Sequence, residues 1–154
     1  MRWQQGRDTL DSMINRGELE RVPASREQAD LLLAQAHQHV SSARAIAESD
    51  PAGAYQLLYD AARKALAAVL ENQGLRATSR GGHIAVREAI SAQLDPPLGG
   101  IFRPFDRLRR RRNQAEYPSA DEPGFGADDI DRDLPKVREI VEAAAKVVDQ
   151  MSPY

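Results

Sequence analysis

The segment from about residue 128 to residue 151 places the strongest constraint on the fold. Its apolar residues recur every three or four positions, at Ile130, Leu134, Val137, Val141, Ala144, Val148 and Met151. Residues with this spacing share one face of an α-helix, whereas a strand places every second residue on the same side. The pattern therefore predicts one long helix. Its apolar stripe packs either inside the domain or against a second copy of the chain, and the first is the simpler interpretation.

Start and stop signals predict further helices before this segment. Ser25 fits the first residue of a capping box and begins a helix that runs to about residue 48. Asp50 caps the next helix, Pro51 occupies its first turn, and Gly74 ends it. Three other helices are expected over about Gln5 to Arg16, His83 to Gln93 and Ile101 to Glu116, the last closed by Tyr117-Pro118.

The composition agrees with a helical protein. Alanine, leucine, glutamate, glutamine and arginine are frequent, aromatic residues make up 5% of the chain, and strand-like runs of β-branched residues are absent. No repeat or linker divides the 154 residues, a length that suits one domain. We therefore predict a single all-α domain over residues 1–154, an up-and-down bundle of four long helices plus short helices. Its core is expected over about residues 25–151, after a short N-terminal helical extension.

The residues that the chain lacks exclude several kinds of site. It has no cysteine, which excludes disulfides and thiolate metal sites. His37 and His39 are two positions apart on a predicted helix, so they do not face one metal ion. We predict no metal and no cofactor. No apolar run approaches the ~18 residues of a membrane span, and the N-terminus is unlike a signal peptide. A cytoplasmic protein without a membrane partner is expected.

Charge is distributed unevenly along the chain. The formal net charge is -2, yet six arginines lie between Arg103 and Arg112, and six carboxylates lie between Asp121 and Asp133. A local basic face binds phosphate even on a protein of negative net charge, because the nearby field governs the contact. A run of charge is also typical of a solvated helix face, and this alternative stays open.

One of these arginines lies on the apolar side of its predicted helix. At about 100° per residue and with Ile101 at zero, Phe105 falls near ~40°, Leu108 near ~340° and Arg112 near ~20°. The remaining arginines are predicted to point to other faces; they are Arg103, Arg107, Arg109, Arg110 and Arg111. A guanidinium keeps its charge, so Arg112 needs an acceptor. The acceptor is either a carboxylate such as Asp60 or Glu116 or a bound phosphate, unless the side chain extends past the end of the helix into solvent.

Three other residues invite a functional interpretation. His83 follows Gly81-Gly82 at the start of a predicted helix, and it is interpreted as structural, with a phosphate or base contact as the alternative. Tyr55 and Tyr59 share one helix face and are expected to pack in the core.

Two segments of the chain resemble HEPN domains (higher eukaryotes and prokaryotes nucleotide-binding), which are helical bundles, many of them metal-independent RNA endonucleases. The first segment runs from Ala54 to Leu75, and the second is Arg112-Asn113-Gln114-Ala115-Glu116-Tyr117. The family signature is an arginine, four intervening positions of which the first is often polar, and a histidine. Arg112 and Asn113 match this signature, and Tyr117 stands in the histidine position.

The resemblance implies a homodimer that brings two such motifs into one cleft. There Arg112, beside Asn113, would stabilise charge on the phosphorane, and Tyr117 would occupy the place of the residue that assists attack by the ribose 2′-hydroxyl. A phenol with a pKa near ~10 is a weak base at pH 7. Reading the motif from Arg111 instead puts Glu116 in the histidine position, and a carboxylate can act as a base. Both registers stay open, and Arg109 with Arg111 is expected to guide RNA phosphates.

The resemblance also implies partners. Many HEPN proteins of this size resemble toxins paired with a nucleotidyltransferase antitoxin, which in some cases transfers AMP to a tyrosine near the motif; Tyr117 is the candidate acceptor. The leading prediction is therefore a toxin-like ribonuclease of HEPN type that acts on RNA. The alternative is a non-catalytic HEPN module that dimerises and binds nucleotide or a nucleotidyltransferase partner. A plainer third interpretation is a helical adaptor with no role in nucleic-acid binding.

Overall fold

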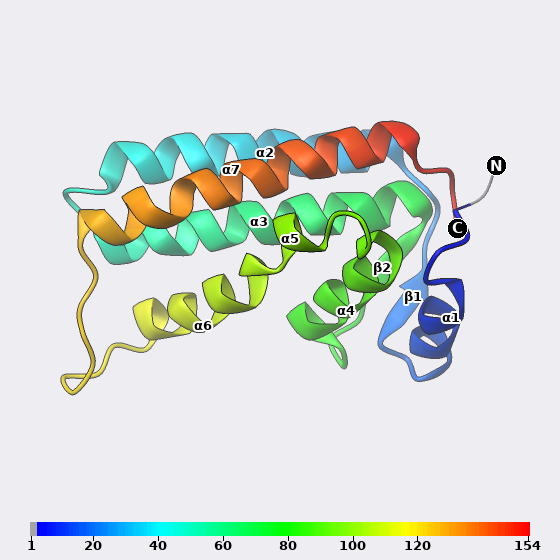
Figure 1. The fold of residues 1–154 in the computed structure, drawn as a ribbon, viewed down its shortest axis with the longest axis horizontal. Helices are drawn as coiled ribbons and strands as arrows, with labels where there is room; N and C mark the ends of the chain where they lie inside the picture. The colour runs from blue at the N-terminus through cyan, green and yellow to red at the C-terminus, as the bar shows by residue number, and fades with distance from the viewer. Residues whose placement is uncertain (1–2) are drawn as a thin grey trace.

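A computed structural model describes residues 3–154 and shows a mostly helical chain, so the predicted all-α class is confirmed (Figure 1). Met1 and Arg2, which begin the N-terminus judged unlike a signal peptide, lie outside the described residues. The three longest helices are α2 (Arg26–Ile46), α3 (Pro51–Gln73) and α7 (Ala127–Gln150). Figure 1 shows α2 and α7 along one side of α3, while α4 (Gly82–Leu94) and α6 (Pro104–Glu116) pack against its other side.

The predicted signals at the helix ends are confirmed. The Ser25 side chain accepts a hydrogen bond from the backbone N–H of Gln28 at 3.0 Å and so caps α2. Asp50 caps α3 in the same way. Gly74 ends α3 in the left-handed conformation with φ 84°, which a residue without Cβ adopts at little cost. These local signals fix the lengths of α2 and α3, which pack along one another.

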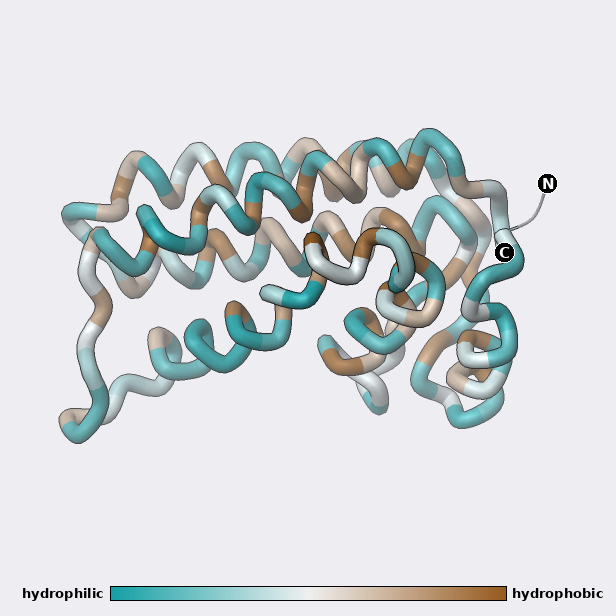
Figure 2. Tube along the Cα trace, in the orientation of Figure 1, coloured by the Kyte–Doolittle hydropathy of each residue, from teal (hydrophilic) through white to brown (hydrophobic). Residues whose placement is uncertain are grey.

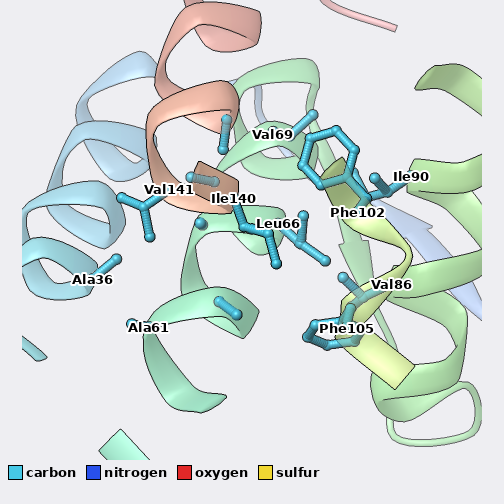
Figure 3. Close-up of a cluster of buried hydrophobic side chains, with 14 of the residues drawn as sticks. Ala36, Ala61, Leu66, Val69, Val86, Ile90, Phe102, Phe105, Ile140 and Val141 are labelled. Atoms are coloured by element: carbon cyan, nitrogen blue, oxygen red, sulfur yellow. The ribbon is translucent and has the colours of Figure 1, made fainter. Parts of the chain in front are cut away.

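The hydrophobic core surrounds α3 on both sides. Figure 3 shows Ala36 of α2 with Ile140 and Val141 of α7 on one side, and Phe102 and Phe105 with Val86 and Ile90 of α4 on the other. Leu66 and Val69 of α3 lie between these groups. The apolar residues of α7 are buried, and Figure 2 shows hydrophobic and hydrophilic residues alternating along this helix. The stripe predicted over residues 128–151 is therefore buried inside the chain.

The predicted helix from Ile101 to Glu116 is divided into two. A short helix, α5 (Gly99–Phe102), ends at Arg103, and α6 begins at Pro104. Proline lacks an N–H, so it suits the first turn of a new helix and not the interior of an existing one. The expectation of four long helices is corrected accordingly: three helices have 21 or more residues, whereas α6 has 13.

Two short strands were not predicted. β1 (Leu19–Arg21) pairs antiparallel with β2 (Leu75–Ala77), and Leu19 lies opposite Ala77. Each strand has three residues, which is too short for an alternating pattern to be recognised in the sequence. The pair holds the chain that follows α1 against the end of α3.

The N-terminal segment belongs to the core. Leu10 and Met13 of α1 (Arg7–Asn15) are fully buried, and the segment is therefore more than an extension of the bundle. The Tyr154 hydroxyl donates to the carbonyl oxygen of Arg7 and ties the other end of the chain to α1. No helix in residues 3–154 combines the length and the apolar character that crossing a membrane requires.

Candidate functional site

One side of α6 is bound to α7 through buried carboxylates. The Arg107 guanidinium donates to both oxygens of Asp133, at 2.6 and 3.3 Å, and the Asp133 side chain has no exposed surface. The Tyr55 hydroxyl donates to the same carboxylate at 2.7 Å. Arg132 and Lys136 approach it from α7 itself. A fully buried carboxylate with this many donors holds the two helices together and engages both terminal nitrogens of Arg107, whose side chain is 39% exposed.

Arg111 occupies a similar position one turn further along α6. Its guanidinium donates to Asp129 at 3.2 Å, to the Gln114 side chain and to the Gly124 carbonyl oxygen. It also lies 3.9 Å from the centre of the Phe125 ring. The side chain is 17% exposed. Arg111 was predicted to guide RNA, but in the structure its guanidinium is bound to the start of α7 and to the loop that joins α6 to α7.

The electrostatics of this side are balanced. Burial alone would raise the pKa of Asp133, but its bonds with Arg107, Tyr55 and Arg132 outweigh burial and hold that pKa below its ordinary value. Asp129 follows the same pattern. Burial works against its charged form, and the Gly126 N–H together with Arg132 and Arg111 lowers its pKa. Each cation on this side therefore faces a carboxylate that stays ionised.

The opposite side of α6 faces α3 and α4. Here the Arg112 guanidinium lies 5.5 Å from the centre of the Tyr59 ring, and its nearest carboxylate is Glu116 at 2.5 Å. The Arg112 side chain is 27% exposed. The sequence offered Asp60 or Glu116 as the acceptor, and the structure selects Glu116, one helical turn away. Because both partners are partly exposed, this ion pair contributes little to stability.

Arg109 is also turned inward on this side. Its Nε atom is buried, and no hydrogen-bond partner for it is found within residues 3–154. The helical angles predicted that Arg112 alone faces inward, and this prediction was incomplete. Arg107 and Arg111 also face a neighbouring helix, α7, and Arg109 buries its Nε atom. A buried donor without a partner costs free energy unless a ligand supplies an acceptor.

Tyr59 and His83 form a pair between α3 and α4. The Tyr59 hydroxyl lies 2.5 Å from Nδ1 of His83, and the two ring centres are 5.4 Å apart. Tyr59 also stacks on Phe105 of α6. Burial raises the pKa of Tyr59 to about 12. Burial, followed by the charges of Arg63 and Arg112, lowers the pKa of His83 below 6.5, so the imidazole is neutral at pH 7.

A second group of charges borders this pair on α3. Asp60 accepts from Arg63 at 2.9 Å and lies 3.8 Å from Lys64. The Lys64 ammonium in turn lies 2.7 Å from Nε2 of His39, and burial with this cation lowers the pKa of His39. We call Tyr59, Arg63, His83, Arg109 and Arg112 the arginine–histidine cluster. Its carboxylate neighbours are Asp60 and Glu116, so the cations are in excess.

An open cavity of about 360 Å³ adjoins the arginine–histidine cluster. It lies between α2, α3, β2 and α4, and both Arg63 and His83 line it. A larger cavity of about 430 Å³ lies on another part of the surface, where Trp3, Leu98 and Ala143 line it together with Glu139, Glu142 and Lys146. Neither of these two cavities is lined by an arginine of α6, and the smaller one reaches the arginine–histidine cluster through Arg63 and His83.

The residues predicted from the sequence fall into three places. Arg109 and Arg112 meet in the arginine–histidine cluster, and Glu116 joins them through its ion pair with Arg112. Arg111 is held on the α7 side. Asn113 is exposed, and Tyr117 is 72% exposed just after the end of α6. The structure thus separates Tyr117 from the buried aromatic ring beneath Arg112.

From the sequence, His83 was interpreted as structural, with a phosphate or base contact as the alternative, and Arg63 was not singled out. Tyr59 was expected in the core, where it is buried, but its hydroxyl also binds His83. The signal that was available is the helical spacing of Tyr59 and Arg63, since residues four apart share a face. No spacing in the sequence relates α3 to α4. Within residues 3–154, no group of three His, Cys, Asp or Glu side chains is arranged to hold a metal ion.

Comparisons with protein-family models, with curated proteins and with solved structures found no match. The functional assignment consequently rests on the residues of this chain and on their geometry.

Proposed function

We propose that the protein is a toxin-like, metal-independent RNA endonuclease of HEPN type, with the arginine–histidine cluster as its phosphate-binding site. The observation that carries the proposal is the convergence of Arg109 and Arg112 on the Tyr59–His83 pair. In the part of the chain that the structure describes, the buried Nε of Arg109 has no partner, and Arg112 pairs with the partly exposed Glu116 and donates to the side chain of Asn113 at 3.4 Å. Guanidinium groups in such a setting favour an anionic ligand with several oxygen acceptors, as a phosphodiester has.

Catalysis without a metal ion requires fixed positive charge at the phosphate. During attack by the ribose 2′-hydroxyl, negative charge increases on the non-bridging phosphate oxygens. Arg112 lies over a buried ring, with Arg109 near it, and such pre-positioned donors stabilise the developing charge without reorganisation. The HEPN resemblance of Arg112-Asn113 supports the same assignment. We further propose that the protein acts as a homodimer and that a nucleotidyltransferase antitoxin is its partner.

The test is cleavage of single-stranded RNA by the purified chain in the presence of EDTA. We expect the wild-type protein to cut, and Arg112→Ala to lose at least ~100-fold in rate, as removal of one oxyanion donor does elsewhere. Arg110→Ala is the matched control, because Arg110 is an exposed arginine of the same helix, and it should retain activity. If folded wild-type protein that is free of antitoxin does not cleave RNA, the proposal that the protein is a ribonuclease is rejected.

A second function is favoured by the position of Tyr117. The residue in the family's histidine position is 72% exposed, and Glu116, its neighbour, is paired with Arg112. Neither is arranged as a base. This supports a non-catalytic HEPN module that binds nucleotide or a nucleotidyltransferase partner through the same arginines. Such a module would bind RNA with a strong dependence on salt concentration but leave it uncut.

A further inference from the structure

The imidazole of His83 has one ring nitrogen engaged and the other available. Nδ1 lies 2.5 Å from the Tyr59 hydroxyl, and within the described residues Nε2 makes no hydrogen bond. The ring lines the open cavity of about 360 Å³, so a ligand has access to its edge. His83 thus differs from His39, whose Nε2 is engaged by Lys64.

Charges surround this imidazole from two helices. Arg63 and Asp60 face it from α3, and Arg109 and Arg112 face it from α6. The arginines outweigh Asp60, and with burial they keep the ring neutral at pH 7. A neutral imidazole beside fixed cations is the combination that phosphodiester cleavage needs, because one group accepts a proton while the others bind the anion.

We infer that His83 is the catalytic base for RNA cleavage, that Tyr59 positions it, and that the site is completed within one chain. This inference rests on the proposed function. It assigns the role of the base to His83 of α4 in place of Tyr117. His83 is too far from Arg112 in the sequence for a short motif to include both. A second copy of the chain is then not required to supply the imidazole.

The reaction proceeds as follows. Nε2 of His83 accepts the proton of the ribose 2′-hydroxyl, and the 2′-oxygen forms a bond to phosphorus while the bond from phosphorus to the 5′-oxygen breaks. The 5′-oxygen takes a proton from water, and His83 returns its proton to solvent. The products are a 2′,3′-cyclic phosphate and a 5′-hydroxyl. Arg112 and Arg109 hold the non-bridging oxygens throughout.

Tyr59 is compatible with the tautomer that this step needs, because a phenol oxygen accepts as well as donates. For Nε2 to accept a proton, Nδ1 must carry one and donate it to the phenol oxygen. Burial raises the pKa of Tyr59 to about 12, so the phenol stays neutral at pH 7, and in this proposal its oxygen accepts the bond from Nδ1. After proton transfer the imidazolium keeps the same hydrogen bond. The stacking of Tyr59 on Phe105 holds the phenol in place.

The test compares His83→Ala, Tyr59→Phe and His37→Ala in the cleavage of single-stranded RNA. We expect His83→Ala to reduce kcat at least ~100-fold with little change in KM, as the loss of a general base does. Added imidazole should restore part of this rate, because the truncated side chain opens space at the cavity. Tyr59→Phe should give a smaller loss in kcat. His37 is exposed on α2, and His37→Ala should behave as wild type.

The pH profile supplies a readout that a structural role would not change. Wild-type kcat/KM should fall as pH drops through the lowered pKa of His83, and in the imidazole-rescued variant the profile should instead follow the pKa of imidazole. If His83→Ala cuts at the wild-type rate while Arg112→Ala does not, the proposed function stands and the role of His83 is refuted. If folded His83→Ala is inactive but imidazole does not restore activity, His83 is not the base. If the wild type fails to cut, the proposed function itself fails, and the base assignment with it.

Discussion

The two sides of α6 present the same residue type to two different environments. On the α7 side, Arg107 and Arg111 meet the buried carboxylates Asp133 and Asp129. On the α3 side, Arg109 and Arg112 meet a buried phenol, a neutral imidazole and one partly exposed carboxylate, Glu116. The helix is continuous, so the difference comes entirely from the neighbouring helices.

An arginine-rich sequence alone therefore does not indicate a binding site. An arginine whose guanidinium is matched by an internal carboxylate serves the fold, and one whose buried donors lack an acceptor retains capacity for a ligand. The carboxylates that decide the matter lie on α7, some twenty residues later in the chain. The predictions below test this division of α6 into a structural side and a ligand side.

The largest effect is expected from Asp133→Ala on the structural side. The change leaves the Tyr55 hydroxyl and part of Arg107 without their acceptor in a buried position. Breaking a buried pair of this kind costs about 3 kcal/mol of unfolding free energy. Urea denaturation followed by circular dichroism measures the loss. Asp131→Ala, an exposed position on the same helix, should change stability by less than about 0.5 kcal/mol.

An intermediate effect of a different kind is expected from Arg109→Met. The substitution keeps much of the side-chain volume. It also removes the buried Nε atom, which has no hydrogen-bond partner among the described residues, so the free energy of unfolding should stay constant or rise by up to about 1 kcal/mol. RNA affinity should nevertheless fall, and the slope of log affinity against log salt should decrease by about 0.7. Fluorescence anisotropy with a labelled oligonucleotide provides both quantities. If the variant is less stable and its RNA affinity is unchanged, Arg109 has a structural role and does not bind RNA.

The smallest effect is expected in the pH dependence of folding stability, which distinguishes the two sides of α6 without any ligand. The folded-state pKa values of His83 and His39 lie below 6.5, so unfolded histidines take up protons first as pH falls. Stability is therefore complete above pH 6.5 and decreases as pH drops from there through the folded pKa values. Asp129 and Asp133 have lowered pKa values, and their contribution is lost only in the more acidic range below 3.8. Thermal melts of the wild type and of His83→Gln should diverge between pH 7 and 5; parallel curves would contradict the assignment.

The fold could be predicted where a signal is local. Ser25, Asp50 and Gly74 act on backbone groups within a few residues, so α2 and α3 were predicted closely. The helix wheel also placed Phe105 and Leu108 correctly in the core. The break at Pro104 was missed because an apolar stripe on both sides of a proline resembles one helix.

The site could be predicted only in part, because it is assembled from three helices. The motif on α6 pointed to Arg112, and Arg109 was expected to guide RNA phosphates together with Arg111; Arg109 and Arg112 both lie in the arginine–histidine cluster. The wheel could not show that Arg111 would meet Asp129, since that contact depends on how α7 approaches α6. His83 reaches Tyr59 through the packing of α4 on α3, a contact that no spacing in the sequence encodes. The catalytic prediction for Tyr117 stays a prediction.

The shared use of Asp133 has an evolutionary consequence. One carboxylate accepts from Tyr55 and Arg107 and also pairs with Arg132 and Lys136. A lineage that lost this aspartate first would pass through an intermediate in which several hydrogen-bond donors lack their acceptor at the same time. The accessible route replaces the donors beforehand, with phenylalanine at position 55 and an apolar residue at position 107. Homologues should therefore vary at these three positions as a group, while the arginines at positions 109 and 112 vary independently of α7.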